Sequence, residues 1–346
     1  MLKEFLIDVC QNHFVSGFEH INGDKMIKYF EPYTDTYEKD KIGSYIFKSN
    51  GTNDTRIMLS AHIDEIGLMI TKILDDGFLG FTQVGGINPA SLIAQDVIIH
   101  GRENVFGVIG IKPPHVTSAE DRDKTFKLDE LYIDTGYPKE ILEKLVRIGD
   151  VATVKRELVP LQGNMIAAKA FDDKACIAVM LETAKELKKM THKSSIYYTC
   201  SAQEETGYRG AFTASYKINP DIAIILDVTH GKAPEMGSDA PLLGKGPAVC
   251  IGSRLNPKLT KKFIEVCKNY NYPFQYEVAP AATGTDTEAI QINREGVPCI
   301  LLSIPLRYMH TSVETISLKD VEITGRAIAR FINEIDNSDL EEILCF

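Results

Sequence analysis

The 346-residue sequence contains no tryptophan, no closely paired cysteines, no long apolar run and no cluster of basic residues. Without a long apolar run we expect no transmembrane helix, and with a net charge of −10 and no basic patch we expect no nucleic-acid partner. The seven cysteines lie singly, mostly in apolar segments, so we expect reduced core thiols rather than disulfides. The N-terminal residues resemble no signal peptide, and together these absences predict a cytoplasmic globular protein.

The pattern of apolar residues changes twice along the chain. Residues 71–163 show short strand-like segments separated by glycines, which is typical of a small all-β barrel or sandwich. Residues 1–70 and 164–346 instead alternate short buried strands with helices, which predicts an α/β domain whose mostly parallel sheet is flanked by helices. The β segment is therefore expected to be inserted into the α/β domain. The segment 117–126 is charged and poor in apolar residues, so we expect it to be a surface loop.

The predicted core elements can be placed by their periodicity. The expected helices lie at about 2–13, 24–30, 173–190, 257–269, 286–294 and 318–335, and the expected core strands at 56–61, 196–202, 222–226 and 299–304. Ser317 and Asp320 resemble a capping box at the start of the last helix.

Two adjacent carboxylates, Glu204 and Glu205, follow the strand expected at 196–202. Thr206 and Gly207 come next and permit the backbone to turn there. Two carboxylates in one pocket repel each other unless a cation or a shared proton lies between them. This pair therefore predicts either a metal site or an acid/base pair.

Further metal-competent side chains follow the other predicted core strands or open the buried helix. They are His62, Asp64, Asp172, Asp173, Asp227, His230 and His310. Each alone has an ordinary explanation, since Asp172 can cap a helix and His310 can be a core histidine. Ligands bind at the carboxyl ends of strands in open α/β sheets, however, and five such segments on one edge favour a functional site. Three carboxylates and two imidazoles suit two Zn²⁺ or similar ions that clamp a nucleophilic water, with one neighbouring acid left as general base.

Five segments carry a resemblance to a known family. The residues at 60–67, 170–174, 203–207, 226–229 and 307–310 resemble those of the tetrahedral (TET-type) metallo-aminopeptidases, the glutamyl and deblocking aminopeptidase relatives among the di-zinc exopeptidases. The resemblance extends over the whole chain, including the β insertion. The sequence departs from the usual family pattern at Lys174 and Cys176, where arginine and glycine are common.

The resemblance implies a role for each site residue. One metal ion would be held by His62, Asp172 and Asp227, and the other by Asp172, Glu205 and His310, so that Asp172 bridges them. Glu204 would be the general base and then the acid, and Asp64 would orient His62. The family often has an irregular, cis-like peptide between the paired aspartates.

The same resemblance implies an activity and an assembly. The enzyme would use two divalent ions per subunit, Zn²⁺ or Co²⁺, and a water bridging them to remove the N-terminal residue of short peptides. Dimers would assemble into a tetrahedral dodecamer, with the β segment at 71–163 making much of the contact. His115, on a loop of that segment, is either a surface residue or a contributor to a neighbouring subunit's active site.

The residues themselves leave other functions open. A carboxypeptidase or deacylase of related fold would need the same metal ligands. A glycoside hydrolase of the endoglucanase type could use Glu204 with a second carboxylate, but it would leave His62 and His310 unexplained and would lack tryptophan for sugar stacking. A third alternative is a shell that binds metal only for structure. Arg254 and Lys258 are either surface charges or partners for an acidic substrate side chain.

Overall fold

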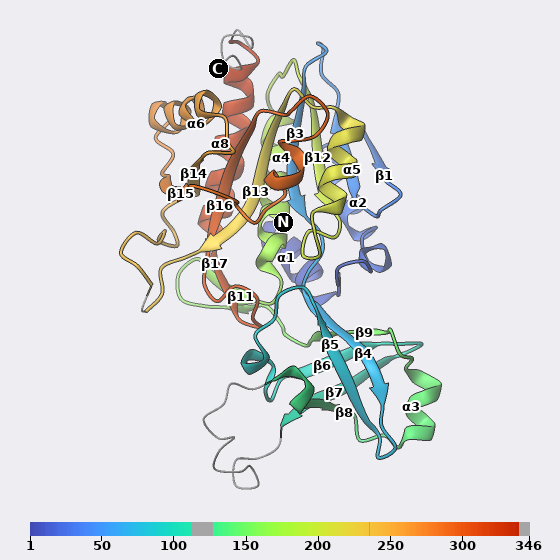
Figure 1. Ribbon diagram of the computed structural model, residues 1–346. Helices are drawn as coiled ribbons and strands as arrows, with labels where there is room; N and C mark the ends of the chain where they lie inside the picture. Colours follow the sequence, from blue (N-terminus) through green and yellow to red (C-terminus); the bar gives the residue numbers. More distant parts are fainter. Residues whose placement is uncertain (112–126, 235, 339–346) are drawn as a thin grey trace.

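The computed structural model describes residues 1–111, 127–234 and 236–338. Figure 1 shows a larger layered part that contains both ends of the described chain and, below it, a small barrel. His115 and the surface loop expected at 117–126 lie outside the described residues.

An eight-stranded mixed sheet forms the centre of the larger part. Its order is β1 (Thr36–Lys39), β2 (Tyr45–Ser49), β12 (Ser195–Ser201), β3 (Arg56–His62), β13 (Ile222–His230), β16 (Cys299–Leu306), β14 (Ala248–Gly252) and β15 (Gln275–Ala279). The four central strands, β12, β3, β13 and β16, are parallel to one another, whereas β2 and β14 are antiparallel to their inner neighbours. The carboxyl ends of the four parallel strands therefore meet at one edge, which faces the barrel (Figure 1).

Helices cover both faces of this sheet, as expected for an α/β domain. Apolar side chains of one face form the main core with α1 (Leu2–Gln11), α2 (Lys25–Phe30), α4 (Phe171–Leu187), α6 (Pro257–Asn269) and α8 (Leu318–Ile335). The other face packs against α5 (Arg209–Ile218) and α7 (Thr287–Ile290). The first part of α4 is buried on all sides, because it lies between the sheet and α8.

The barrel is closed by six antiparallel strands. Their order is β4 (Gly67–Ile73), β5 (Phe78–Val84), β8 (Leu131–Asp134), β7 (Asn104–Ile111), β6 (Asp96–His100) and β9 (Val151–Val154). Inward side chains such as Ile99, Ile109 and Ile133 form a core separate from that of the larger part. The short helix α3 (Lys139–Leu145) packs on the barrel, and the 3₁₀ turns are η1 (Glu19–Ile21), η2 (Pro89–Leu92) and η4 (Leu128–Glu130). The α/β class with an inserted barrel is thus confirmed.

A three-stranded sheet of β10 (Val159–Pro160), β11 (Met165–Ala168) and β17 (Glu314–Ser317) completes the fold. Its middle strand β11 leads into α4, while β17 follows the loop after β16 and leads into α8. Two segments that carry candidate site residues are therefore joined by main-chain pairing of β11 with β17.

Several predicted boundaries are corrected by the structure. The strand expected at 222–226 continues to His230, because β13 pairs with β16 from Ala223 to His230, and Asp227 consequently lies inside the strand. The helix expected at 286–294 is one turn, Thr287–Ile290. Those expected at 257–269 and 318–335 have the observed bounds of α6 and α8.

The capping box expected at the start of α8 is wrong. Ser317 occupies the N-cap position but makes no side-chain bond to the helix. The carboxylate of Asp320 instead accepts hydrogen bonds from the backbone N–H groups of Gly244 (2.6 Å) and Gly246 (2.8 Å). The buried acid therefore stabilises a neighbouring loop rather than the helix end, a long-range contact that local spacing does not reveal.

Two further observations concern the cysteines and the apolar helices. All six cysteines in the described part of the chain are buried and unpaired. Within the same residues, no helix is both long and apolar enough to cross a membrane.

The N-cap of α6 provides a test of the local structure. Asn256 Oδ1 accepts from the N–H groups of Lys258 and Leu259, both at 3.0 Å. We expect Asn256→Ala to lower the free energy of unfolding by about 1 kcal/mol, because two helix-end donors lose their acceptor. Ser317→Ala is the matched control at a cap without such a bond, and it should have an effect below about 0.5 kcal/mol. Denaturant unfolding at fixed protein concentration measures both; equal effects would contradict this assignment.

Candidate active site

The candidate ligands converge on one cavity at the carboxyl edge of the parallel strands. His62 ends β3, Glu204 and Glu205 lie in the turn after β12, Asp227 lies in β13, and His310 lies in the loop after β16. Asp172 lies in the first turn of α4, which begins directly after β11. The cavity has a volume of about 500 Å³, and all six side chains line it.

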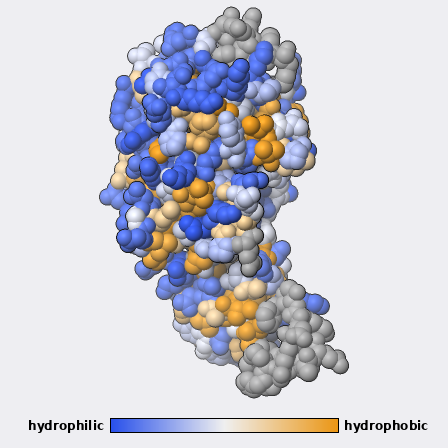
Figure 2. All heavy atoms as spheres, turned by 90° about the vertical axis from the view of Figure 1, so that its left-hand side faces the viewer, coloured by the Kyte–Doolittle hydropathy of each residue, from blue (hydrophilic) through white to orange (hydrophobic). Residues whose placement is uncertain are grey.

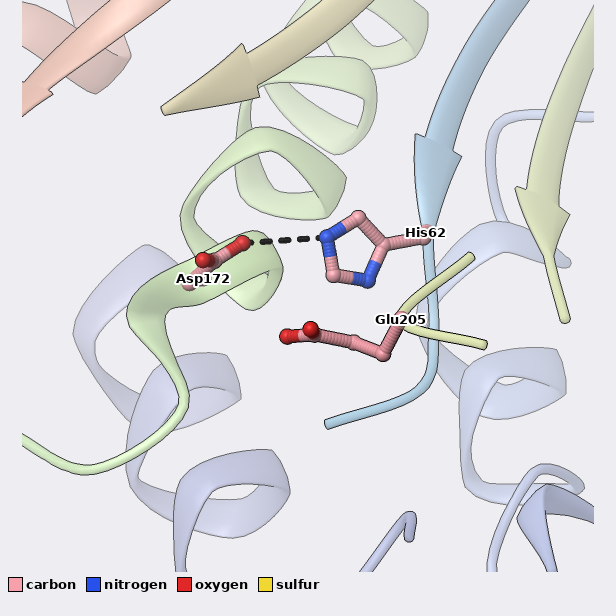
Figure 3. A group of neighbouring side chains, drawn as sticks. All are labelled: His62, Asp172 and Glu205. Carbon is pink, nitrogen blue, oxygen red and sulfur yellow. Dashed lines mark hydrogen bonds and ion pairs between the residues drawn. The ribbon is translucent and has the colours of Figure 1, made fainter. Parts of the chain in front are cut away.

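The carboxylate of Asp172 lies between two imidazoles. Its Oδ1 is 3.0 Å from Nε2 of His62, and its Oδ2 is 3.1 Å from Nε2 of His310. His310 Nε2 is also 3.3 Å from Oε1 of Glu205. Figure 3 shows His62, Asp172 and Glu205 converging from a strand, a helix start and a turn. One ligand atom from each of these three lies within 4.8 Å of the others, a spacing that one cation can span.

A second group of possible ligands includes Asp173, a metal-competent residue to which the family resemblance assigns no role. Ligand atoms of His62, Asp173 and Asp227 also lie within 4.8 Å of one another. Asp173 is fully buried, and its Oδ2 accepts from the backbone N–H of His62 at 3.2 Å. The Asp172–Asp173 peptide is cis, as the family resemblance implies. The paired aspartates thus both face the His62 segment.

Asp64 organises the turn that carries the two glutamates. Its two carboxylate oxygens accept from the backbone N–H groups of Glu204 (3.0 Å) and Glu205 (3.1 Å). Nδ1 of His62 donates to the backbone carbonyl of Asp64 at 3.1 Å, whereas the carboxylate Oδ1 is 3.6 Å away. This hydrogen bond leaves Nε2 as the ring nitrogen that faces the cavity.

Lys174 binds the backbone of the segment that follows His62. It is fully buried, and its ammonium donates to the carbonyl oxygens of Ile63 (2.6 Å) and Asp64 (3.2 Å). The Phe14 ring centroid lies 4.8 Å from the ammonium, a cation–π distance. Lysine thus stands where the family commonly has arginine, and its ammonium contacts two carbonyl oxygens and the face of an aromatic ring.

Glu314 is a second supporting residue that the sequence analysis missed. It is buried at the start of β17, and its two oxygens accept from the backbone N–H groups of Asp172 (3.1 Å) and His310 (2.8 Å). One carboxylate thus fixes the two segments that carry the candidate ligands Asp172 and His310. Its position four residues after His310 is the only signal in the sequence that could have suggested this role.

Burial and the interactions among charged side chains shift the pKa values of the site residues. Burial opposes ionisation of His310, but hydrogen bonds to Asp172 and Glu205 outweigh it and raise the His310 pKa to about 11. Burial also opposes ionisation of Asp172, yet hydrogen bonds to both imidazoles hold its pKa well below the usual range. Burial raises the pKa of Glu204 to about 10. The charge of Asp227 adds to this rise, and His62 offsets only part of it. Burial and the charge of Asp172 raise the pKa of Asp227 well above normal.

The donor set fits divalent cations. Five carboxylates line the cavity (Asp172, Glu204, Glu205, Asp227 and Glu277), and its other ionisable groups include three imidazoles. Asp173 Oδ1 is a buried oxygen without a hydrogen-bond partner among the described residues, and the buried Glu205 Oε1 has only the His310 imidazole nearby, at 3.3 Å. A surplus of buried carboxylate oxygens beside imidazole nitrogens is chemistry that Zn²⁺ or a similar ion satisfies.

The sequence and the fold agree with a peptidase family. A family model described as M42 glutamyl aminopeptidase matches residues 43–326. The chain belongs to this family. The lysyl aminopeptidase of Pyrococcus furiosus is 36% identical over 342 residues, which cover 97% of this chain and 98% of that protein. The M42 chain is accordingly an aminopeptidase, a peptide hydrolase.

Solved structures of TET peptidases share the whole fold. A TET aminopeptidase from a marine sediment archaeon, Thaumarchaeota archaeon SCGC AB-539-E09, matches with a TM-score of 0.94 at 30% identity, covering 99% of this chain and 98% of that chain. The TET1 peptidase of Pyrococcus horikoshii, which can assemble into a tetrahedron or a large octahedral shell, matches at 0.83 with 29% identity, covering 96% and 99%. The resemblance to TET-type aminopeptidases is thus confirmed.

Asp64 gives a direct test of how the glutamate turn is held. We expect Asp64→Asn to lower turnover of an aminoacyl anilide at least about 10-fold, because the amide replaces one of two acceptor oxygens with a donor. Asp40→Asn is the matched control: Asp40 Oδ1 accepts from the backbone N–H groups of Ile42, Gly43 and Ser44, away from the cavity. It should alter the melting temperature but not the turnover of folded enzyme. Similar loss of turnover in both variants would argue against a specific role for Asp64.

Proposed function

We propose that this enzyme is a dinuclear metallo-aminopeptidase that hydrolyses the N-terminal peptide bond of short peptides. The observation that carries the proposal is the position of Asp172, whose two oxygens contact the two imidazoles on opposite sides. A carboxylate in that position can serve two cations at once. The unpaired thiols are consistent with a cytoplasmic enzyme.

The residues divide into two ligand sets around Asp172. His62 and Asp227 would complete one site, and Glu205 and His310 the other. Asp173 is an additional candidate for the first set, because one of its oxygens lies within 4.8 Å of a ring nitrogen of His62 and of a carboxylate oxygen of Asp227. Zn²⁺ and Co²⁺ both suit this mixture of imidazole nitrogen and carboxylate oxygen.

Two divalent ions held there would polarise the scissile carbonyl and lower the pKa of water at the site. Two cavity-lining acids, Glu204 and Glu277, belong to neither ligand set, and we assign proton transfer to Glu204 because it is adjacent to Glu205. Its Oε2 is 3.9 Å from Nε2 of His62, so it borders the ligands without belonging to them. Its carboxylate takes a proton from the attacking water and delivers it to the leaving amine. Asp64 holds the backbone of this turn, so the proton carrier keeps its place during turnover.

The other hydrolase classes explain less of the site. A glycosidase needs two carboxylates but neither His62 nor His310, and the two imidazoles contact Asp172 directly. A metal site with only a structural role would not need Glu204 beside the ligands. A carboxypeptidase or deacylase would require recognition of a free carboxylate, and no lysine or arginine is among the described residues that line the cavity.

We also propose that the barrel mediates assembly of dimers and then of a tetrahedral dodecamer. Large apolar side chains on the barrel are exposed, among them Phe78, Phe106, Val108 and Tyr132. Figure 2 shows apolar side chains gathered at the barrel end of the molecule. Exposed apolar surface of this kind is typical of an interface between subunits.

Metal removal tests the proposed chemistry. Dialysis against EDTA should abolish hydrolysis of an aminoacyl anilide, and addition of Zn²⁺ or Co²⁺ should restore it, because the cations polarise the carbonyl. An N-acetylated peptide and a C-amidated peptide serve as controls for the end that is recognised. We expect only the N-acetylated peptide to resist cleavage. Full activity after metal removal would refute the two-metal proposal.

Light scattering tests the assembly. The chain has a mass of 38.5 kDa, and we expect a particle of many times that mass. Replacing Phe106 and Val108 by serine should reduce the mass by weakening the apolar contact. A monomeric wild type would contradict the proposal.

A further inference from the structure

One cavity-lining carboxylate has no part in the chemistry assigned above. Glu277 lies on β15, the strand at the edge of the sheet, and reaches the cavity from the side opposite β3. Of the five carboxylates in the cavity, Asp172, Glu205 and Asp227 are proposed ligands and Glu204 the proton carrier. Glu277 is the remaining one, so another purpose must explain its position.

Two hydroxyl groups fix the carboxylate of Glu277. Its Oε1 accepts from Oγ1 of Thr229 at 2.5 Å, and its Oε2 accepts from Oγ of Ser303 at 2.9 Å. Thr229 lies two residues after Asp227 on β13, so their side chains share a face of the sheet. Each carboxylate oxygen can accept more than one hydrogen bond. Glu277 is therefore held beside the proposed metal ligands with capacity for another donor.

The cavity offers this carboxylate no lysine or arginine. None occurs among the described residues that line it, and its other polar lining groups include Thr283, Thr285 and His230. Arg254, considered above as a partner for an acidic substrate, instead forms an ion pair with Glu288. Lys258 does not line the cavity. The half-buried carboxylate of Glu277, held in one orientation, is therefore complementary to a cationic group on a bound substrate.

We propose that Glu277 selects substrates whose N-terminal residue is lysine or arginine. The proposal rests on the aminopeptidase function proposed above, since it places the side chain of the N-terminal residue against the β13–β15 wall of the cavity. The cationic head of that side chain would donate to the carboxylate that Thr229 and Ser303 orient. Glu277 acts on specificity and takes no part in proton transfer.

Steady-state kinetics with lysyl and leucyl p-nitroanilides test this assignment. We expect the metal-loaded wild type to prefer the lysyl substrate. Glu277→Gln keeps the size of the side chain and should lower kcat/KM for the lysyl substrate about 100-fold, because the cation loses its counter-charge. For the leucyl substrate the change should stay within about threefold. Glu277→Lys should reverse the charge preference and raise the activity on a glutamyl anilide relative to the lysyl one.

Controls separate selectivity from general damage. Glu265→Gln, on α6 and outside the cavity, should leave both substrates unaffected. Equal losses of kcat/KM on both substrates in Glu277→Gln would show a general positioning role and overturn the proposal. A wild type that hydrolyses leucyl anilide without favouring lysyl anilide would also overturn it, while leaving the aminopeptidase function intact. A wild type inactive on every aminoacyl anilide in the presence of Zn²⁺ or Co²⁺ would instead refute the proposed function.

Discussion

Mutual repulsion among buried carboxylates is the constraint on which this active site depends. The fold brings Asp172, Glu205 and Asp227 into one cavity, where burial already disfavours their charged forms. The two imidazoles on either side of Asp172 offset part of this charge and hold its pKa low. Divalent cations would offset the rest. The same constraint explains why the site lies where four parallel strands end, since only there can five separate segments reach a common point.

A second set of charged groups holds the segments of the proposed ligands by their backbones. Asp64 binds the Glu204–Glu205 turn, and Lys174 binds the carbonyls that follow His62. Glu314 joins the segments of Asp172 and His310. All three side chains are buried and come from different parts of the chain. The positions of the proposed ligands therefore depend on long-range contacts, and substitutions in these supporting residues should act through geometry rather than through loss of a proposed ligand.

Acids and histidines follow buried strands that periodicity could locate, so the sequence could predict which segments carry candidate ligands. His62, Glu205 and His310 were proposed in this way, and the structure brings them to one cavity, while the order of helices and strands predicted the α/β class. Glu314 and Glu277 could not be found similarly. Glu314 acts through two backbone amides, and Glu277 lies on an edge strand whose contact with Thr229 depends on the order of β13, β16, β14 and β15 in the sheet. The capping box at Ser317 failed for the same reason, because Asp320 is engaged by a loop about 75 residues away.

We propose that the adjacent glutamates have different tasks, with Glu205 as a ligand and Glu204 as the proton carrier. Metal content per chain and turnover, measured in parallel for Glu204→Gln and Glu205→Gln, distinguish the two tasks. We expect Glu204→Gln to keep the wild-type metal content and to lose about 10²–10⁴-fold in turnover, whereas Glu205→Gln loses bound metal. A Glu204→Gln enzyme that retains full activity, or one that loses metal to the same extent as Glu205→Gln, would contradict it.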